Sequence, residues 1–221
     1  MKNKGQMSEH FLVGIMLALA GGFLDAYTYL VRGGVFANAQ TGNIVLLGTY
    51  LAKGTYSKVF LYLVPILAFT IGILISEIVK SKLKLSTKIH WRQLIVIFEI
   101  IMLFCVTFIP QNQHNTIVNT VISFVCSLQV ESFRKINGHA VATTMCTGNL
   151  RSGTEALYLG ITQKNKSLIL KCFNNYGIIL FFIIGAFLGT VITKIYLTYS
   201  LFFACAVLII PLVMMFKTLE K

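Results

Sequence analysis

The stretch NAQTGN (residues 38–43) places the tripeptide Thr-Gly-Asn inside a long apolar region, and TMCTGN (residues 144–149) repeats that tripeptide in a second apolar region. Polar groups are costly in apolar surroundings unless they are paired or belong to a functional site. The duplication therefore predicts two equivalent structural units, and the way in which the two tripeptides sit in the chain decides the fold.

Composition indicates an integral membrane protein. The 221 residues are 56% hydrophobic and 12% charged, and the mean hydropathy is +0.78, which leaves too little polar surface for a soluble domain of this length. The first apolar run lacks the small-residue cleavage pattern of a removable signal peptide. Six apolar runs approach the length needed to cross a membrane: 11–30, 59–78, 94–109, 117–130, 178–192 and 201–216.

The cysteines and the basic residues are both interpreted as consequences of a membrane location. An odd number of cysteines without a Cys-x-x-Cys pair predicts small apolar fillers, so no disulfide framework, no metal and no cofactor is expected. The net charge of +12 is better explained by cytoplasmic loops that face anionic lipids than by nucleic-acid binding. The five cysteines are Cys105, Cys126, Cys146, Cys172 and Cys205.

An ungapped offset of 106 positions (147 minus 41) lays the second Thr-Gly-Asn on the first. The same offset pairs Asp25 with Glu131 and lays the first three apolar runs roughly on the last three. We interpret the chain as a duplicated unit, with a first repeat at 1–110 and a second at 111–221.

The distribution of Lys and Arg distinguishes two topologies. If the Thr-Gly-Asn segments cross the membrane, the chain has eight spans and each side carries nine basic residues, which is no bias. If each segment enters the membrane and returns on the same side, six spans remain and the two halves are inverted. One face then carries fourteen basic residues and the other four, an asymmetry typical of the positive-inside rule. The fourteen are Lys2, Lys4, Lys80, Lys82, Lys84, Lys88, Arg92, Arg134, Lys135, Lys164, Lys166, Lys171, Lys217 and Lys221, and the four are Arg32, Lys53, Lys58 and Lys194.

The second topology is favoured, with both termini cytoplasmic. The expected fold is an all-α integral membrane protein with two inverted three-span repeats, each with a re-entrant half-helix that opens at Thr-Gly-Asn. The expected spans are 11–31, 58–79 and 92–109 in the first repeat and 115–136, 172–194 and 198–216 in the second, with re-entrant segments at 35–53 and 141–159.

The spacing around each tripeptide predicts a short helix. Thr41 stands where an N-cap belongs, Gly42 allows close backbone approach, and Gly54 lies at the expected C-cap. Thr147 and Gly160 repeat this spacing. A helix of about 12 residues rises about 18 Å, which is too short for a hydrocarbon core of about 30 Å. Each tripeptide is therefore expected to open a half-helix near mid-membrane.

Two inverted half-helices would bring their N-termini together near the centre of the membrane. This is the general plan of the aquaporins and of several transporters with broken helices. Exposed backbone at that depth is tolerated where it is buried in protein or lines a watery cavity. The alternative is that Thr-Gly-Asn only caps a kinked helix within a packed bundle.

Five of the seven carboxylates fall within or at the ends of the predicted spans. Intramembrane acids are functional candidates by default. Glu77 and Glu99 lie near the basic loop, however, and can simply pair with Lys80 or Arg92 in a structural role.

Asp25 and Glu131 are the sharper candidates because the repeat makes them equivalent. A desolvated carboxylate suits a proton carrier or a cation ligand. The alternative is that each carboxylate braces the neighbouring loop through backbone N–H groups. Glu155 follows Arg151 by four residues, which is the spacing of an intrahelical ion pair.

Two long segments of the chain resemble a known family. "GGFLDAYTYLVRGGVFANAQTGNIVLLG" and "QVESFRKINGHAVATTMCTGNLRSG" are similar to the two signature regions of the bacterial YoaK family of multi-span membrane proteins, a domain of unknown function. The resemblance implies a bacterial inner-membrane protein and supplies no established reaction. Many relatives have neutral residues in place of Val-Glu-Ser after Gln129, so Glu131 departs from the pattern and an obligatory acid pair is in doubt. The signature positions are Asp25, Asn38, Thr41, Gly42, Asn43, Thr147, Gly148 and Asn149.

No catalytic set is found, because the four histidines are scattered and neither a His-x-x-x-His nor a Gly-x-Ser-x-Gly motif occurs. We therefore expect no enzyme, although an intramembrane enzyme stays open. The expected function is an inner-membrane transporter or channel for a small polar solute or ion, with proton coupling and homo-oligomerisation as options. The alternative is a non-transporting membrane scaffold or regulatory subunit. The expected pathway residues are Asp25, Asn38, Thr41, Gly42, Asn43, Glu131, Thr147, Gly148, Asn149 and Arg151.

Overall fold

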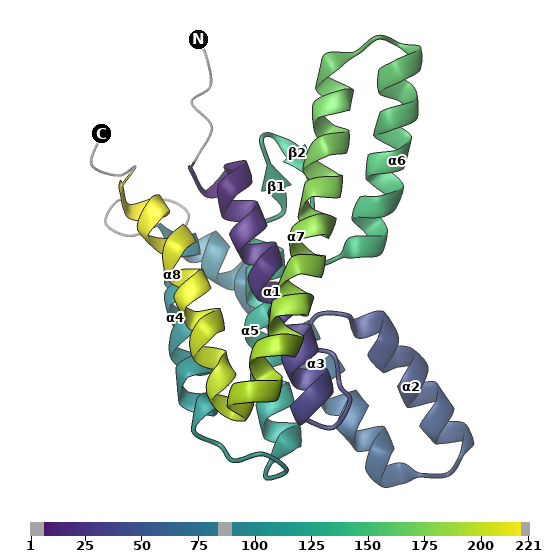
Figure 1. Ribbon diagram of the computed structural model, residues 1–221, viewed down its shortest axis with the longest axis vertical. Helices are drawn as coiled ribbons and strands as arrows, with labels where there is room; N and C mark the ends of the chain where they lie inside the picture. Colours follow the sequence, from purple (N-terminus) through teal and green to yellow (C-terminus); the bar gives the residue numbers. More distant parts are fainter. Residues whose placement is uncertain (1–6, 84–89, 218–221) are drawn as a thin grey trace.

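The computed structural model describes residues 7–83 and 90–217, which are largely helical (Figure 1). Two 3-10 helices, η1 (Met7–Glu9) and η2 (Leu197–Ser200), precede the first and the last α-helix, and strands β1 (Lys135–Ile136) and β2 (His139–Ala140) form an antiparallel hairpin. The α-helices are α1 (Phe11–Val31), α2 (Gln40–Ala52), α3 (Tyr56–Leu83), α4 (Trp91–Thr107), α5 (Asn115–Ser132), α6 (Cys146–Thr162), α7 (Lys166–Tyr196) and α8 (Leu201–Lys217).

Polar side chains fix the starts of two of the long helices. At α7, the Asn165 side chain accepts hydrogen bonds from the N–H groups of Ser167 and Leu168. At α4, His90 and Gln93 form a capping box, in which the Gln93 side chain accepts from the His90 N–H at 2.9 Å. Such caps satisfy N–H groups that the first turn of a helix leaves free, so local sequence positions these helix ends.

The helices pack in a pattern that repeats between the two halves of the chain. Helix α1 packs along α7, and α5 packs along α3. The short helices α2 and α6 lie on α3 and α7, α8 covers α1, and α4 covers α5. Helices α4 and α8 contact each other. Exchanging α1–α4 for α5–α8 leaves this set of contacts unchanged.

Glycines permit the closest of these contacts. A Cβ added at Gly22 of α1 would collide with the carbonyl oxygen of Phe182 in α7, and one added at Gly185 of α7 would collide with that of Leu19. Gly72 of α3 lies in the same way against the Phe124 carbonyl of α5. Small residues at helix contacts are the usual means of close packing in membranes.

The course of the chain brings the starts of α2 and α6 to mid-height. The start of α1 and the end of α8 lie toward one end of the molecule (Figure 1), which we call the terminal end; the opposite end is the far end. Helix α1 runs to the far end, after which the chain turns back and α2 starts at mid-height and returns to the far end. Helix α5 runs the opposite way, and α6 starts at mid-height and returns to the terminal end.

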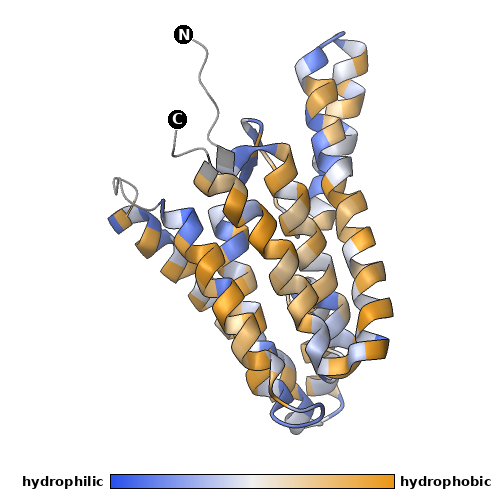
Figure 2. Cartoon of the chain, turned by 60° about the vertical axis from the view of Figure 1, so that its left-hand side comes forward, coloured by the Kyte–Doolittle hydropathy of each residue, from blue (hydrophilic) through white to orange (hydrophobic). Residues whose placement is uncertain are grey.

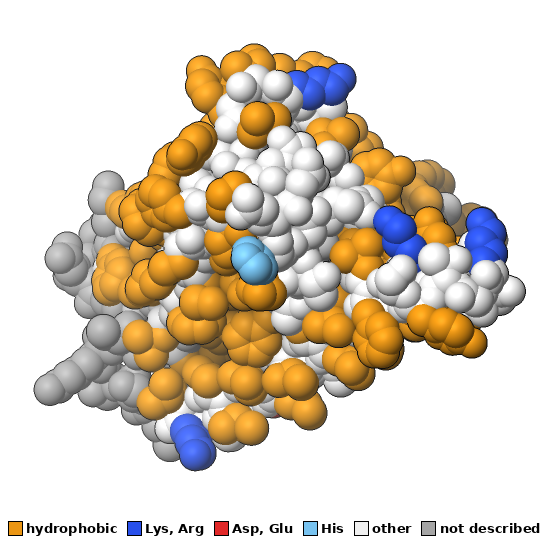
Figure 3. Space-filling model, turned by 90° about the horizontal axis from the view of Figure 1, so that it is seen from below, with side chains coloured by type: hydrophobic (Ala, Val, Ile, Leu, Met, Phe, Trp, Pro, Cys, Tyr) orange, Lys and Arg blue, Asp and Glu red, His pale blue; other side chains and the backbone are white. Residues whose placement is uncertain are grey.

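Basic residues gather at the terminal end. The α6–α7 turn, the β-hairpin and the start of α4 all lie there (Figure 1) and carry Lys164, Lys135 and Arg92. Figure 3 views the far end and shows a broad hydrophobic surface with few Lys and Arg; no Asp or Glu of the described residues is visible on it. Of the basic residues used in the topology argument, Lys2, Lys4, Lys84, Lys88 and Lys221 lie outside the described residues.

The expected all-α membrane fold is confirmed. Three segments are long and apolar enough to cross a membrane: Phe11–Val31, Tyr56–Leu83 and Lys166–Phe216, the last of which joins α7, η2 and α8. Hydrophobic residues run along the helices (Figure 2), and large ones such as Leu74 and Phe187 are exposed on the outside. This outer surface suits contact with lipid.

Several helix boundaries differ from the expected ones, and two of the differences have a clear structural reason. The span expected at 115–136 ends at Ser132, because the following residues form the β-hairpin. Asn137 and Gly138 form the turn of this hairpin with positive φ angles of 50° and 80°. The dipeptide Asn-Gly is a strong hairpin signal, but it does not interrupt the hydrophobic pattern from which the span was predicted.

The second expected C-cap is also wrong. Gly160 lies inside α6, which continues to Thr162, and Lys164 adopts the positive φ of 52° after the helix end. Gly54 does follow the end of α2 with a φ of 65°, as expected of a glycine that ends a helix.

Candidate functional site

The starts of α2 and α6 open onto one cavity. It has a volume of about 350 Å³ and lies between the two crossing segments that precede these helices. Helices α3 and α7 each add an aromatic wall, Phe69 and Phe182. The lining residues are Asn38, Ala39, Gln40, Thr41, Phe69, Thr144, Met145, Cys146, Thr147, Gly148 and Phe182. The structure thus brings together two motifs that lie over a hundred residues apart in the sequence.

Both crossing segments meet the middle of α1 at Gly21. A Cβ added at Gly21 would collide with the Thr144 side chain of the second half and would lie 3.6 Å from the Asn38 amide nitrogen of the first half. Asn38 also donates to the Gly21 carbonyl at 3.2 Å. The missing side chain at Gly21 therefore leaves room for both segments to cross.

The asparagine of each tripeptide holds its own crossing segment in place. Asn43 accepts from the Phe36 N–H at 3.0 Å and donates to the Phe36 carbonyl at 2.7 Å. Asn149 accepts from the Ala142 N–H at 3.2 Å and donates to the Ala142 carbonyl. In both halves the partner lies seven residues before the asparagine, so the two tripeptides do the same structural work. This role could not be predicted from the tripeptides alone.

The expected threonine caps are wrong. The N-cap residues are Ala39 for α2 and Met145 for α6, and neither makes a side-chain cap hydrogen bond. Thr41 and Thr147 instead lie in the first turn of their helices, exposed, and line the cavity. Their hydroxyl groups are therefore available to a solute.

The two glycines of the motifs have different surroundings. A Cβ on Gly42 would meet the ring of Phe36 at 2.9 Å, whereas one on Gly148 would have no atom within 4 Å. The nearest atoms to a Cβ at Gly42 belong to Phe36, and a Cβ at Gly148 has none within 4 Å, so neither position touches the other short helix. Gly148 borders open space in the cavity.

Asp25 braces the first crossing segment. Its carboxylate accepts from the Asn38 N–H at 2.6 Å, and its side chain is buried. Gln40 adds a hydrogen bond to the Ala37 carbonyl at 2.9 Å, and Asn43 donates to the Gln40 side chain at 2.9 Å. The bracing alternative considered for Asp25 is therefore the arrangement that the structure contains.

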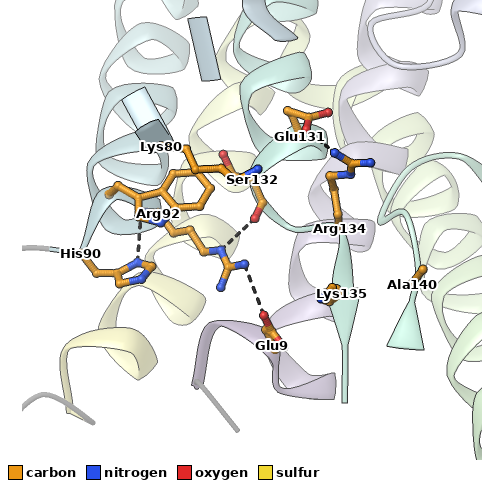
Figure 4. A pocket seen from close by; sticks show the side chains of 10 residues that line it. Glu9, Lys80, His90, Arg92, Glu131, Ser132, Arg134, Lys135 and Ala140 are labelled. Atoms are coloured by element: carbon orange, nitrogen blue, oxygen red, sulfur yellow. Dashed lines mark hydrogen bonds and ion pairs between the residues drawn. The ribbon is translucent and has the colours of Figure 1, made fainter. Parts of the chain in front are cut away.

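Glu131 does not take an equivalent position. It lies at the terminal end and forms an ion pair with Arg134 at 2.7 Å, in a separate pocket of about 570 Å³ (Figure 4). The expected equivalence of Asp25 and Glu131 is wrong, because α5 ends before the register that the ungapped offset requires.

The pocket at the terminal end is a network of internally paired charges. Arg92 donates to the Ser132 carbonyl at 2.8 Å and reaches Glu9 at 3.4 Å (Figure 4). Burial and the nearby Arg92 charge lower the pKa of His90. Because Lys80, Arg92 and Arg134 already have carboxylate or carbonyl partners, this pocket is a weaker candidate site than the central cavity.

The remaining acids differ in their pairing. Glu77 pairs with Lys80 at 2.7 Å, as expected. Glu99 is fully buried and makes no ion pair with a described residue, so its expected pairing with Lys80 or Arg92 is wrong. The expected pair of Arg151 and Glu155 is also absent from the ion pairs of the described residues; both side chains are exposed, and Arg151 does not line the cavity.

The cavity is lined by apolar side chains together with a few uncharged polar ones, and no charged side chain of the described residues lines it. The N-terminal ends of α2 and α6 border the cavity with the positive ends of their dipoles. Such ends favour an anion or a carbonyl oxygen. At α2, the N–H groups of Gln40 and Gly42 already donate to the carbonyls of Asn38 and Ala39. Hydroxyl groups of Thr41 and Thr147 add donors and acceptors. Phe69 and Phe182 were not anticipated, since nothing in their sequence surroundings distinguishes them from lipid-facing aromatics.

Comparisons with known proteins support a membrane protein without a known activity. The family model described as "Protein of unknown function (DUF1275)" matches residues 13–214. The chain is 28% identical over 144 residues to the "UPF0700 transmembrane protein YoaK" of Bacillus subtilis (strain 168), and the match covers 62% of this chain and 62% of that relative. The chain thus spans less than two thirds of the length of this curated relative. No solved structure matches the chain.

Proposed function

The chain belongs to the DUF1275 family and is similar to a transmembrane protein. From this premise we propose that it is a transporter or channel for a small polar solute or ion. The observation that carries the proposal is the cavity shared by the two Thr-Gly-Asn motifs. In an apolar bundle, polar groups that converge on open space are costly unless they serve a ligand or water.

The proposed architecture is a pair of inverted three-span repeats, each with a re-entrant half-helix. The exchange symmetry of the helix contacts supports the duplication. The opposite directions of α2 and α6 from a common mid-height start support the inversion and the re-entrant course (Figure 1). The proposed repeats are residues 1–110 and 111–221.

The proposed location is the bacterial inner membrane, with the terminal end in the cytoplasm. The concentration of basic residues at that end, against the sparse Lys and Arg of the far end (Figure 3), supports this orientation because cytoplasmic loops carry an excess of Lys and Arg. We propose no chemical reaction for the chain.

The solute class follows from the lining. Two helix N-termini favour an anion or a carbonyl-bearing molecule, and the volume of about 350 Å³ limits it to a small one. Asp25 is connected to this lining by the hydrogen bond that its carboxylate accepts from the N–H group of Asn38, a lining residue.

The proposal is tested with a substitution that places a side chain in the cavity and leaves the helix contacts intact. Gly148→Leu puts a side chain into the open space of the cavity, whereas Gly48→Leu puts the same side chain on the exposed face of α2, where no atom lies within 4 Å either. Proteoliposomes are assayed for flux of phosphate, urea and potassium. We expect flux of at least one probe in wild type, an approximately tenfold or greater loss in Gly148→Leu, and no loss in Gly48→Leu.

Equal flux in all three proteins would overturn the role of the cavity. A wild type that conducts none of the probes, while both leucine variants insert and fold normally, would favour a scaffold or regulatory subunit instead.

A further inference from the structure

Glu99 is a fully buried carboxyl group without a cationic partner among the residues that the structure describes. It lies on α4 with none of its side chain exposed, and the ion pairs of the described residues do not include it. An ionised carboxylate in such surroundings is strongly disfavoured, so that a group of this kind neutralises itself by holding a proton.

Gln129 of α5 faces this carboxyl group. One terminal atom of its amide lies 3.1 and 3.2 Å from the two Glu99 oxygens, and the other lies 3.4 Å from the Leu17 carbonyl oxygen of α1. An amide nitrogen only donates and an amide oxygen only accepts, so the orientation of Gln129 depends on the protonation of Glu99.

The two possible orientations are not equally good. If Glu99 is ionised, the Gln129 nitrogen must turn toward it, and the amide oxygen then faces the Leu17 carbonyl, where two acceptors oppose each other. If Glu99 is protonated, its O–H donates to the amide oxygen and the amide nitrogen donates to Leu17. Only the protonated form satisfies all three groups, and unsatisfied polar groups in a core are costly.

A row of polar side chains on α5 connects this pair to the cavity. Ser123 accepts from the cavity residue Gln40 at 3.5 Å. Cys126, one turn further along α5, lies within electrostatic reach of both Glu99 and Asp25, and Gln129 follows. Residues 123, 126 and 129 recur at about one helical turn and thus share one side of α5.

We propose that Glu99 is the proton-carrying carboxyl group of this protein and that Gln129 reports its protonation to α1 by turning its amide. The titratable groups within electrostatic reach of Glu99 are two thiols, Cys126 on α5 and Cys205 on α8. Cys126 is also within electrostatic reach of Asp25 on α1. Arg92, the cation on α4 itself, is engaged with Glu9 and Ser132. The coupling of this proton to solute rests on the proposed function; the protonation of Glu99 does not.

Infrared spectroscopy tests the proton directly. Wild type, Glu99→Gln, Asp25→Asn and Glu131→Gln are compared in lipid at neutral pH, in ordinary and in heavy water. We expect a carboxylic-acid C=O band in wild type that persists in Asp25→Asn, which lacks the other buried acid, and in Glu131→Gln, where the replaced acid is ion-paired with Arg134. The same band is expected to be missing from the spectrum of Glu99→Gln. A band that is unchanged in Glu99→Gln overturns the proposal.

A second variant tests the role of Gln129. Gln129→Met keeps the length and approximate volume of the side chain but removes the amide. We expect the C=O band of Glu99 to move to higher wavenumber because it loses a hydrogen-bond acceptor. An unmoved band would show that Glu99 does not donate to Gln129 and would overturn that part of the proposal.

The coupling is tested in proteoliposomes that contain a trapped pH-sensitive dye. With a probe that wild type transports, the ratio of uptake with and without a pH gradient is expected to fall to about one in Glu99→Gln, with gradient-free exchange preserved. Retained gradient dependence overturns the coupling role. If wild type transports none of the probes, the proposed function fails while the infrared result still decides whether Glu99 holds the proton.

Discussion

Single asparagines hold the two crossing segments because their amide carries a donor and an acceptor at short reach. Asn43 uses both on the backbone of Phe36, and Asn149 uses both on that of Ala142. A threonine cap, which the sequence suggested, would have satisfied only an N–H group at the helix start. The importance of the tripeptides could be predicted from their duplication, but their mechanism depends on backbone seven residues away, which no local pattern identifies.

Asp25 is expected to act as an acceptor for backbone in addition to any role in proton coupling. Asp25→Asn keeps an oxygen for the Asn38 N–H and should leave thermal stability in detergent nearly unchanged. Asp25→Ala leaves that buried N–H without a partner and should cost about 2 kcal/mol of unfolding free energy. Equal stability of the two variants would contradict the bracing role.

His90 predicts a loss of stability in mild acid. Its ring accepts from the Arg92 N–H at 3.3 Å at the start of α4, and burial and the Arg92 charge lower its pKa from the ordinary 6.5. The unfolded chain therefore binds a proton more readily than the folded one, and stability falls as the pH drops below about 6.5. Thermal unfolding is measured between about pH 5 and about pH 8. The unfolding temperature should depend less on pH in His90→Asn, which retains a capping side chain, than in wild type. An unaltered slope would exclude His90 as its source.

The apolar runs predicted that a helix exists at each place better than they predicted where the helix ends. The span predicted at 115–136 includes the start of the β-hairpin as well as α5, because Val130 and Phe133 are apolar whether or not the helix continues through them. The two short helices were predicted from glycine spacing, yet α6 runs past Gly160 to Thr162. At this position a glycine is needed for packing, since a Cβ would meet the Ile169 side chain at 2.6 Å. A glycine in a sequence does not reveal whether it ends a helix or admits a neighbour.

The contact between α1 and α7 predicts which glycines cannot be replaced. Gly22→Ala forces a methyl group into the Phe182 carbonyl and should cost about 1–3 kcal/mol or prevent folding. Gly48→Ala, in the open surroundings of α2, should be neutral or stabilising by about 0.5–1 kcal/mol because alanine favours helix. Detergent-phase thermal unfolding of both variants checks this contrast, and comparable stabilities would mean that α1 and α7 can separate without penalty.

For the molecule as a whole, the ungapped offset of 106 positions predicts the shared order of helices in the two halves correctly. It does not pair the equivalent residues of those helices correctly. Helix contacts repeat between the halves, but the connection before α6 contains the β-hairpin, whereas the one before α2 is the short segment 32–39. An insertion of this kind shifts every equivalence on α5, so that Glu131 falls away from the place of Asp25. Pairwise matching within one chain cannot locate such an insertion, because most aligned positions are interchangeable hydrophobic residues.

The last prediction concerns the course of the chain through the membrane. In the re-entrant topology the α2–α3 turn and the α6–α7 turn lie on opposite faces, because α2 and α6 leave mid-height toward opposite ends (Figure 1). In the eight-span topology the same two turns share one face. Single cysteines at Thr55 and Gln163, which lie in these turns and are exposed, are placed in a variant without the five native cysteines. An impermeant maleimide added to intact cells should label the cysteine at 55 directly and the one at 163 only after permeabilisation. Labelling of both, or of neither, in intact cells would replace the re-entrant arrangement by eight spans.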